Sequence, residues 1–176
     1  LTFRPLDLKL KHTFQIARET RTIQNNVIVL LQDNDEVIGL GEAAPTSYFG
    51  EDVNSVTSVL AQSTDLLSHS DPYQIEDITN RLKNEFPESA AARASIDIAL
   101  HDIIGKKLKI PLYRLLGLNR PESKTTSFTI GIDTLEKMGK KVEEAKDFPL
   151  LKIKVGFKDD IEILRELRKM TRAVFR

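Results

Sequence analysis

Two lysines, Lys152 and Lys154, stand two residues apart in the run "LLKIKVG", which otherwise has the composition of a buried strand. Because strand side chains alternate between faces, Leu151, Ile153 and Val155 share one face and the lysines share the other. The pattern allows two interpretations: a half-exposed strand with a solvated polar face, or a pair of ammonium groups inside a catalytic cavity. A lysine that is desolvated or lies beside a second cation loses its proton more readily, so such a pair can supply a general base.

A histidine beside an aspartate, His101 and Asp102, is the other feature that suggests proton transfer. Adjacent residues on a helix do not face each other, so we expect this pair to bond to backbone or neighbouring strands rather than to form a relay. Asp159 and Asp160 open a predicted helix, where acidic side chains interact favourably with the helix dipole. We therefore expect no metal role for them.

The composition is that of an ordinary soluble globular protein. The 176 residues include 26 Lys and Arg, 26 Asp and Glu, and no cysteine. A balanced charge gives no electrostatic case for binding nucleic acid or an anionic membrane, and no segment has the roughly 18 apolar residues of a membrane span. The lack of cysteine excludes disulfides and thiolate metal sites, and we expect a cytoplasmic location.

The first part of the chain predicts an antiparallel meander followed by helices. Leu6, Leu8 and Leu10 alternate as in a strand, and the turn-forming "DND" separates two further strands at residues 27–31 and 37–40. The run "GEAAPTSYFGED" then predicts a loop. Beyond it, apolar residues recur with helical spacing, which predicts helices at residues 53–67, 75–86 and 89–107 and a short helical turn in "PLYRLLGL".

After residue 120 strands and helices alternate. Strands are predicted at 125–132, 150–156 and 173–176, with helices at 134–147 and 159–171 between them. This order is typical of parallel strands joined by crossover helices. Because the third strand has only begun at the last residue, the sheet would have an uncovered face. We expect that a partner covers it or that the natural protein continues beyond residue 176.

Several motifs together resemble one family. An α+β unit that precedes Lys-x-Lys on the second strand of a βα series resembles the muconate-lactonizing branch of the enolase superfamily. The motifs "GLGEAAP", "TSYFGED" and "ASIDIALHDIIGKKLKIPLYRLLG" are similar to that family's capping domain, and "TSFTIGIDT" and "LKIKVG" are most similar to its dipeptide epimerases. The resemblance implies an α+β capping domain at residues 1–120. Residues 121–176 would then be the first βα units of a (β/α) TIM-type barrel, truncated at its third strand.

The resemblance also implies roles for the lysines. Lys154 would be the general acid/base on one face of the substrate carbon, and Lys152 would hold the substrate carboxylate and help to keep Lys154 neutral. The family epimerises dipeptides through an enediolate that Mg²⁺ stabilises, as is general for enolase-superfamily sites. The three carboxylate ligands and the second lysine base are expected beyond residue 176, so we expect no metal ligand within this chain.

Three further residues are candidates for substrate binding. Arg18 follows "TFQIA" in a loop that covers the barrel mouth in the family, where it would pair with a substrate carboxylate; the alternative is a surface arginine. Tyr48 lies in the "TSYFGED" loop, which also covers the site in the family, although it can equally pack on the capping domain. Thr129 would end the inward face of the first barrel strand, where its hydroxyl would bind substrate or fill the barrel.

We thus expect an isomerase that acts on a small dipeptide, without nucleic-acid or membrane partners, and that forms a homo-oligomer. Related activities remain open: N-acylamino acid racemase, o-succinylbenzoate synthase and cycloisomerase share Lys-x-Lys and the enediolate. A non-enzymatic alternative is an inactive truncated chain that self-associates through its open sheet.

Overall fold

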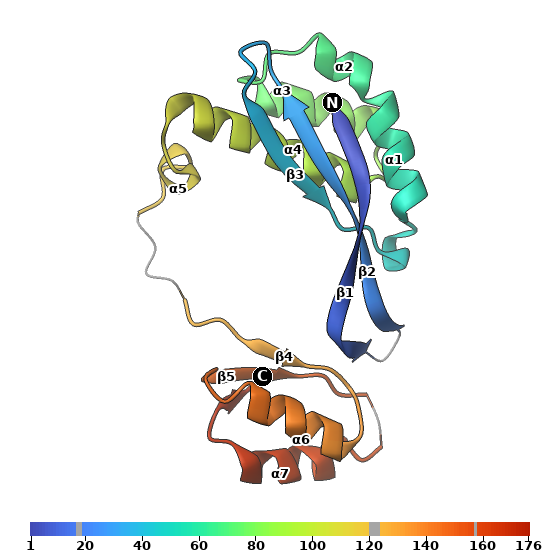
Figure 1. Ribbon diagram of the computed structural model, residues 1–176, viewed down its shortest axis with the longest axis vertical. Helices are drawn as coiled ribbons and strands as arrows, with labels where there is room; N and C mark the ends of the chain where they lie inside the picture. The colour runs from blue at the N-terminus through green and yellow to red at the C-terminus, as the bar shows by residue number, and fades with distance from the viewer. Residues whose placement is uncertain (17–18, 120–123, 157) are drawn as a thin grey trace. The chain divides into compact units, whose positions relative to one another are not determined.

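The computed structural model describes residues 1–16, 19–119, 124–156 and 158–176 (Figure 1). The chain divides into two compact units. The first, the cap unit, comprises Leu1–Leu8 and Gln24–Arg120, and the second, the βα unit, comprises Lys9–Ile23 and Pro121–Arg176. The predicted division at residue 120 did not include Lys9–Ile23 in the second unit. Local periodicity can indicate a strand but cannot show which core the strand contacts.

The sheet of the cap unit contains β1 (Thr2–Ile16), β2 (Glu19–Gln32) and β3 (Ile38–Ala43) in that order. β2 and β3 pair antiparallel, from Val27 opposite Ala43 to Gln32 opposite Ile38. Asp33 closes their turn, because its carboxylate accepts the backbone N–H groups of Asp35 at 3.0 Å and Val37 at 2.8 Å. The predicted hairpin is therefore confirmed.

Helices cover one face of this sheet, as Figure 1 shows. The helices of the cap unit are η1 (Ser47–Phe49), α1 (Val53–Gln62), α2 (Thr64–Ser68), α3 (Ile75–Glu85), α4 (Ala90–Leu108) and α5 (Leu112–Leu115). α4 lies so close to β3 that a Cβ on Gly39 would be 2.0 Å from the carbonyl oxygen of Ala99, and one on Gly41 would be 1.9 Å from that of Ser95. Glycine at alternate positions of β3 is what permits this contact.

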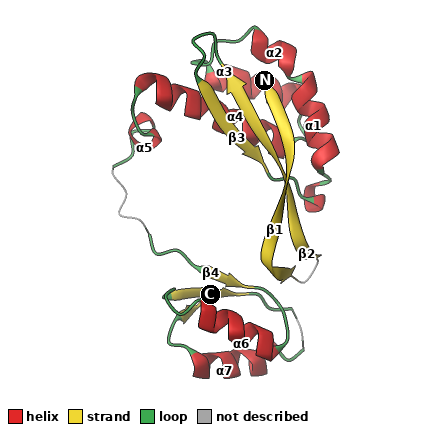
Figure 2. Ribbon diagram, viewed as in Figure 1, coloured by secondary structure: helices red, strands yellow, loops and turns green. Residues whose placement is uncertain are grey.

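The βα unit contains a three-stranded parallel sheet in the order β4 (Phe128–Ile130), β5 (Leu150–Ile153) and β6 (Val174–Phe175). The intervening helices are α6 (Leu135–Glu144) and α7 (Asp160–Met170). Both helices lie on the same face of the sheet (Figure 2). The predicted β-α-β-α-β order is thus observed, although the first strand is shorter than the predicted 125–132.

The outer part of the β1–β2 hairpin belongs to the βα unit. We call the segment Lys9–Ile23 the hairpin tip. The backbone N–H of Ile132, just after β4, donates a hydrogen bond of 2.9 Å to the carbonyl oxygen of Gln15 in β1. The hairpin tip therefore lies at the carboxyl end of β4, which is the end of a parallel strand where barrel enzymes have their active sites.

Candidate functional site

Lys152 lies on the face of the parallel sheet opposite the helices. Its neighbours in β5, Leu151 and Ile153, are 1% and 8% exposed and pack with Ile130 in the core formed with α6 and α7. Lys152 itself is exposed and pairs across the sheet with Thr129 of β4. Because paired residues of neighbouring strands point to the same side, Thr129 and Lys152 share the face that the helices leave uncovered.

Lys154 lies one residue past the end of β5. Its backbone N–H donates a hydrogen bond of 2.9 Å to the carbonyl oxygen of Ile130, so the hydrogen-bonded ladder extends beyond the assigned strand. Strand alternation then places Lys154 on the same face as Lys152, and its side chain is half-buried. Val155, which strand alternation would place with Leu151 and Ile153, lies beyond the ladder and is 50% exposed.

The carboxyl end of β4 carries a charged cluster that the sequence analysis missed. Asp133 accepts the Thr134 backbone N–H at 2.9 Å, and the ammonium groups of Lys137 and Lys141 each lie 3.2 Å from its carboxylate. Burial raises the pKa of Asp133, but these donors outweigh burial and the pKa falls below its ordinary value. The only sequence signal was an aspartate at a helix start with lysines four and eight residues later.

Arg18 lies outside the described residues, so its predicted contact with substrate stays a prediction. Arg21, a second arginine of the hairpin tip, forms an ion pair with Glu19 on the same strand. The hydrogen bond from Arg21 lowers the pKa of Glu19. Part of the hydrogen-bonding capacity of Arg21 is therefore used within the hairpin tip.

Tyr48 lies in η1 of the cap unit and is 68% exposed. Its ring meets that of Phe49 edge-on, with centroids 4.9 Å apart. The loop is held at its carboxyl end: Asp52 and Ser55 form a capping box at the start of α1, and the buried Glu51 accepts the backbone N–H of Ala91 at 2.8 Å. These contacts present Tyr48 at the surface, and its role toward substrate stays a prediction.

His101 and Asp102 do not act on each other. His101 Nδ1 lies 2.9 Å from the carbonyl oxygen of Asp97, one turn earlier in α4. Asp102 accepts the backbone N–H of Leu40 in β3 at 2.8 Å and an ammonium N–H of Lys106 at 2.6 Å. The expectation that they bond to backbone and to a neighbouring strand is confirmed.

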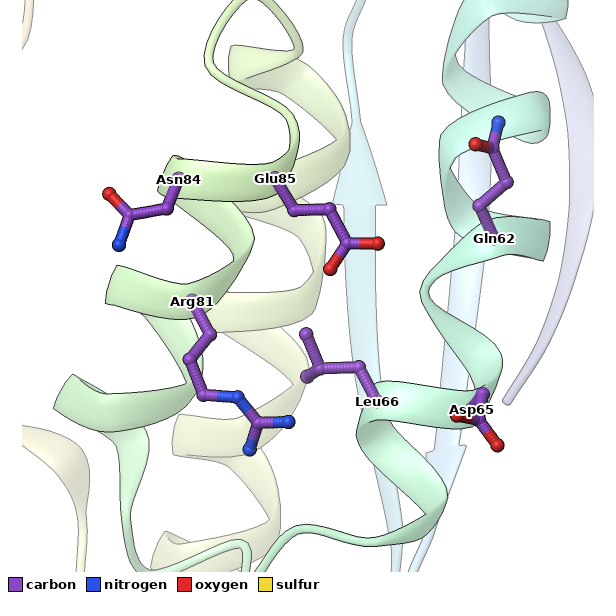
Figure 3. Close-up of a pocket in the computed structure, with 6 residues that line it drawn as sticks. All are labelled: Gln62, Asp65, Leu66, Arg81, Asn84 and Glu85. Carbon is purple, nitrogen blue, oxygen red and sulfur yellow. The ribbon is translucent and has the colours of Figure 1, made fainter.

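A hollow of about 530 Å³ in the cap unit lies apart from these residues. Figure 3 shows the side chains that surround it, which come from α1, α2 and α3. The guanidinium of Arg81 lies 3.7 Å from the carboxylate of Asp77 on the same helix. None of the predicted site residues that the structure describes lines this hollow, which is bordered by Gln62, Asp65, Leu66, Arg81, Asn84 and Glu85.

The described residues contain neither a group of metal ligands nor a membrane-spanning helix. Among residues 1–16, 19–119, 124–156 and 158–176, no three His, Asp or Glu side chains come together as ligands for a metal ion. In the same part of the chain, each helix is too short or too polar to cross a membrane.

The sequence between residues 2 and 117 matches the model of the mandelate racemase / muconate lactonizing enzyme family, N-terminal domain. The chain belongs to this family. It is 41% identical over 172 residues to the L-Ala-D/L-Glu epimerase of Bacteroides thetaiotaomicron. The matched region is 97% of this chain and 44% of the relative. The predicted resemblance to dipeptide epimerases is therefore confirmed.

Solved structures of family members share the fold of both units. One is the dipeptide epimerase of Methylococcus capsulatus, complexed with Mg and the dipeptide L-Arg-D-Lys. Its superposition on this chain has a TM-score of 0.91 at 31% identity and includes 99% of this chain and 51% of the relative. The substrate-liganded L-Ala-D/L-Glu epimerase of Bacillus subtilis also has a TM-score of 0.91, at 27% identity over 99% of this chain and 51% of that one. The chain thus spans about half the length of the relatives it matches.

Proposed function

We propose that the protein carrying this chain is a dipeptide epimerase. The observation that carries the proposal is the placement of Lys152 and Lys154 on the helix-free face at the carboxyl end of β5, beside Thr129 of the neighbouring strand. The relatives that share this half of the fold support it, because they include epimerases solved with bound dipeptides. The proposed activity is an isomerisation that inverts the α-carbon of one residue of the dipeptide.

The proposed architecture is a cap over residues 1–120 and the beginning of a TIM-type barrel over residues 121–176. Parallel strands with all helices on one face, as in the βα unit, are the repeating layout of such a barrel. In a closed barrel the helix-free face becomes the interior. Thr129, Lys152 and Lys154 would then point into the barrel and approach its mouth at the carboxyl ends of the strands.

In the proposed mechanism each lysine has a separate task. The Nζ of Lys154, unprotonated, takes the α-proton from one face of the substrate carbon. A second lysine, proposed to lie outside the 176 residues, delivers a proton to the opposite face and thereby inverts the carbon; in the reverse direction the two groups exchange these tasks. Lys152 pairs with the substrate carboxylate and holds it beside Lys154, while the Thr129 hydroxyl donates a hydrogen bond to the same end of the substrate. Confinement within a barrel keeps bulk water away from the α-carbon of the substrate and from Lys154.

The metal is a separate question, because the described residues offer no ligand set for it. The Methylococcus capsulatus relative is complexed with Mg. We propose that Mg²⁺ serves this protein as well, bound by carboxylates outside the 176 residues. It would supply electrostatic stabilisation of negative charge on the substrate carboxylate. No step above is assigned to the ion.

The remaining proposals concern the substrate, the assembly and the location. Arg18 and Tyr48 are proposed to contact the dipeptide side chains. We further propose a homo-oligomer, to be measured by light scattering, and a cytoplasmic location, which the cysteine-free composition supports.

The test is deuterium incorporation at the α-carbon when the purified protein is incubated with Mg²⁺ and a panel of dipeptides in D₂O. The panel includes L-Ala-L-Glu, a hydrophobic dipeptide and a cationic dipeptide, because epimerases among the relatives differ in these preferences. Intact mass identifies what is assayed: the 176 residues weigh 19.9 kDa, and a complete barrel of about 250 residues would roughly double that. If the protein has the larger mass and no dipeptide undergoes exchange, the proposal is refuted. Turnover of a succinylbenzoate precursor would then favour the alternative activity, o-succinylbenzoate synthase.

A further inference from the structure

Glu144, the last residue of α6, joins this helix to the hairpin tip. Its Oε2 atom lies 2.7 Å from the ammonium nitrogen of Lys11 and 2.8 Å from Nε2 of His12, both in β1. The hydrogen bonds from Lys11 and then His12 hold the pKa of Glu144 below its ordinary range. These groups are solvated, with side chains between 36% and 77% exposed, so the contact is worth little free energy by itself.

A second contact fixes the backbone of the hairpin tip. Besides the hydrogen bond from the Ile132 N–H to Gln15, the neighbouring Gly131 lies directly against Gln15. A Cβ on Gly131 would stand 3.1 Å from the Gln15 carbonyl oxygen and 3.2 Å from its nitrogen. Because both atoms are backbone, they cannot move aside as the end of a flexible side chain does, so Gly131 is the residue that permits this approach.

The two contacts act at separate points of one strand. Lys11 and Gln15 are four residues apart, which corresponds to about 13 Å in an extended chain. Two fixed points determine both the position and the direction of a strand, whereas a single contact would let the hairpin tip pivot. The tip is therefore registered against β4 and α6, the elements beside the strand that carries Lys152 and Lys154.

We propose that Gly131 and Glu144 are positioning residues that fix the hairpin tip at the carboxyl end of β4, the strand next to the one that carries Lys152. The proposal rests on the proposed function, since this end of the sheet is where the dipeptide would bind. Neither residue touches the reacting atoms. Each acts through the hairpin tip.

The first part of the test measures amide hydrogen exchange in peptides covering residues 9–16, which needs no catalytic activity. We expect Gly131→Ala to raise the exchange rate in these peptides about tenfold or more and Glu144→Gln to raise it about two- to threefold. Matched controls on α6 are Glu143→Gln and Gly139→Ala. The Cβ of Gly139→Ala would meet only the flexible end of Met170, at 3.1 Å. The controls should leave exchange in residues 9–16 unchanged.

The second part measures α-deuterium incorporation with the best dipeptide of the panel. We expect Gly131→Ala to lower kcat/KM about tenfold, mainly through KM, and Glu144→Asp to keep more activity than Glu144→Gln. Exchange rates equal to those of the parent would overturn the anchoring. Faster exchange with unchanged KM would overturn the positioning role. A parent without dipeptide turnover would refute the proposed function and the positioning role together, while the exchange data would still decide the anchoring.

Discussion

The two lysines of the candidate site are held by different means. Lys152 lies within β5, where its place is fixed by pairing with Thr129, and Lys154 lies at the last bonded position of the ladder, where its backbone N–H donates to the Ile130 carbonyl oxygen. At the last bonded position of a strand the backbone is held in place, while the far end of a long side chain can still move. This combination suits a base that must reach a substrate carbon and return.

At the scale of single residues, replacing Lys154 by alanine should remove the proposed base. We expect the rate of α-deuterium incorporation to fall about 10³-fold, within the range found for general acid–base catalysis. Lys146→Ala is the control, because this exposed lysine follows α6 on the other side of the sheet from the proposed site. Retention of full exchange by Lys154→Ala would show that another group takes the proton.

Asp33 should make stability depend on pH. Its carboxylate bonds to Lys107 of α4, and this hydrogen bond lowers the pKa of Asp33 and raises that of Lys107. A lowered carboxylate pKa stabilises the fold above the unfolded pKa of about 3.9, and this stabilisation is lost as pH falls through the folded pKa. The raised pKa of Lys107 stabilises the fold below the unfolded lysine pKa of about 10.4, and this stabilisation is lost as pH rises through the folded pKa.

Urea unfolding of the parent and of Asp33→Asn between pH 2.5 and 7 would measure this effect. The amide oxygen of Asn can still accept the turn N–H groups of Asp35 and Val37, so the substitution removes mainly the charge. We expect the parent to be more stable at pH 7 and the difference to shrink toward pH 2.5. A difference that is constant with pH would assign the effect to the turn instead of the ion pair.

At the scale of elements, α4 and β3 pack closely against each other in the cap unit. Gly41→Ala should destabilise the protein by about 3 kcal/mol, because its Cβ would overlap the Ser95 carbonyl and strand and helix would have to separate. Gly105→Ala within α4 is the matched control: its Cβ would meet the side chain of Leu112 at 3.3 Å, and alanine favours helix by about 1 kcal/mol. Equal unfolding midpoints for the two variants would contradict the close packing.

The element order was predictable because periods of 2 and 3.6 are local properties of the sequence. The shared face of Lys152 and Lys154 followed from the same alternation. The length of β4 did not, because a strand extends only as far as its neighbours offer hydrogen-bonding partners. The contacts of Asp133 and Glu144 were also missed, since a charge on an exposed helix has no sequence signal for a partner as distant as Lys11.

At the scale of the whole molecule, the 176-residue chain and a protein with a complete barrel should respond differently to metal. Because the described residues hold no metal-ligand group, we expect Mg²⁺ to leave the thermal unfolding of the 176-residue chain unchanged. In a protein with a complete barrel, Mg²⁺ at 100 times its Kd should stabilise the fold by about 2.7 kcal/mol, and EDTA should abolish α-proton exchange. A raised Tm of the 176-residue chain in Mg²⁺ would reveal ligands that the described residues do not show.

The hairpin tip has a consequence for biosynthesis. Lys11 and Glu144 are 133 residues apart, so a ribosome working at about 5–20 residues per second makes the partner of the tip roughly 7–27 s after the tip itself. During that interval the outer part of β1 is a strand edge with no core to cover it, which is a hazard for aggregation. Lys9 and Lys11 alternate with its apolar residues, and charges at such positions discourage pairing between nascent chains. The ammonium group of Lys11, which later binds Glu144, would thus protect the unfinished chain first.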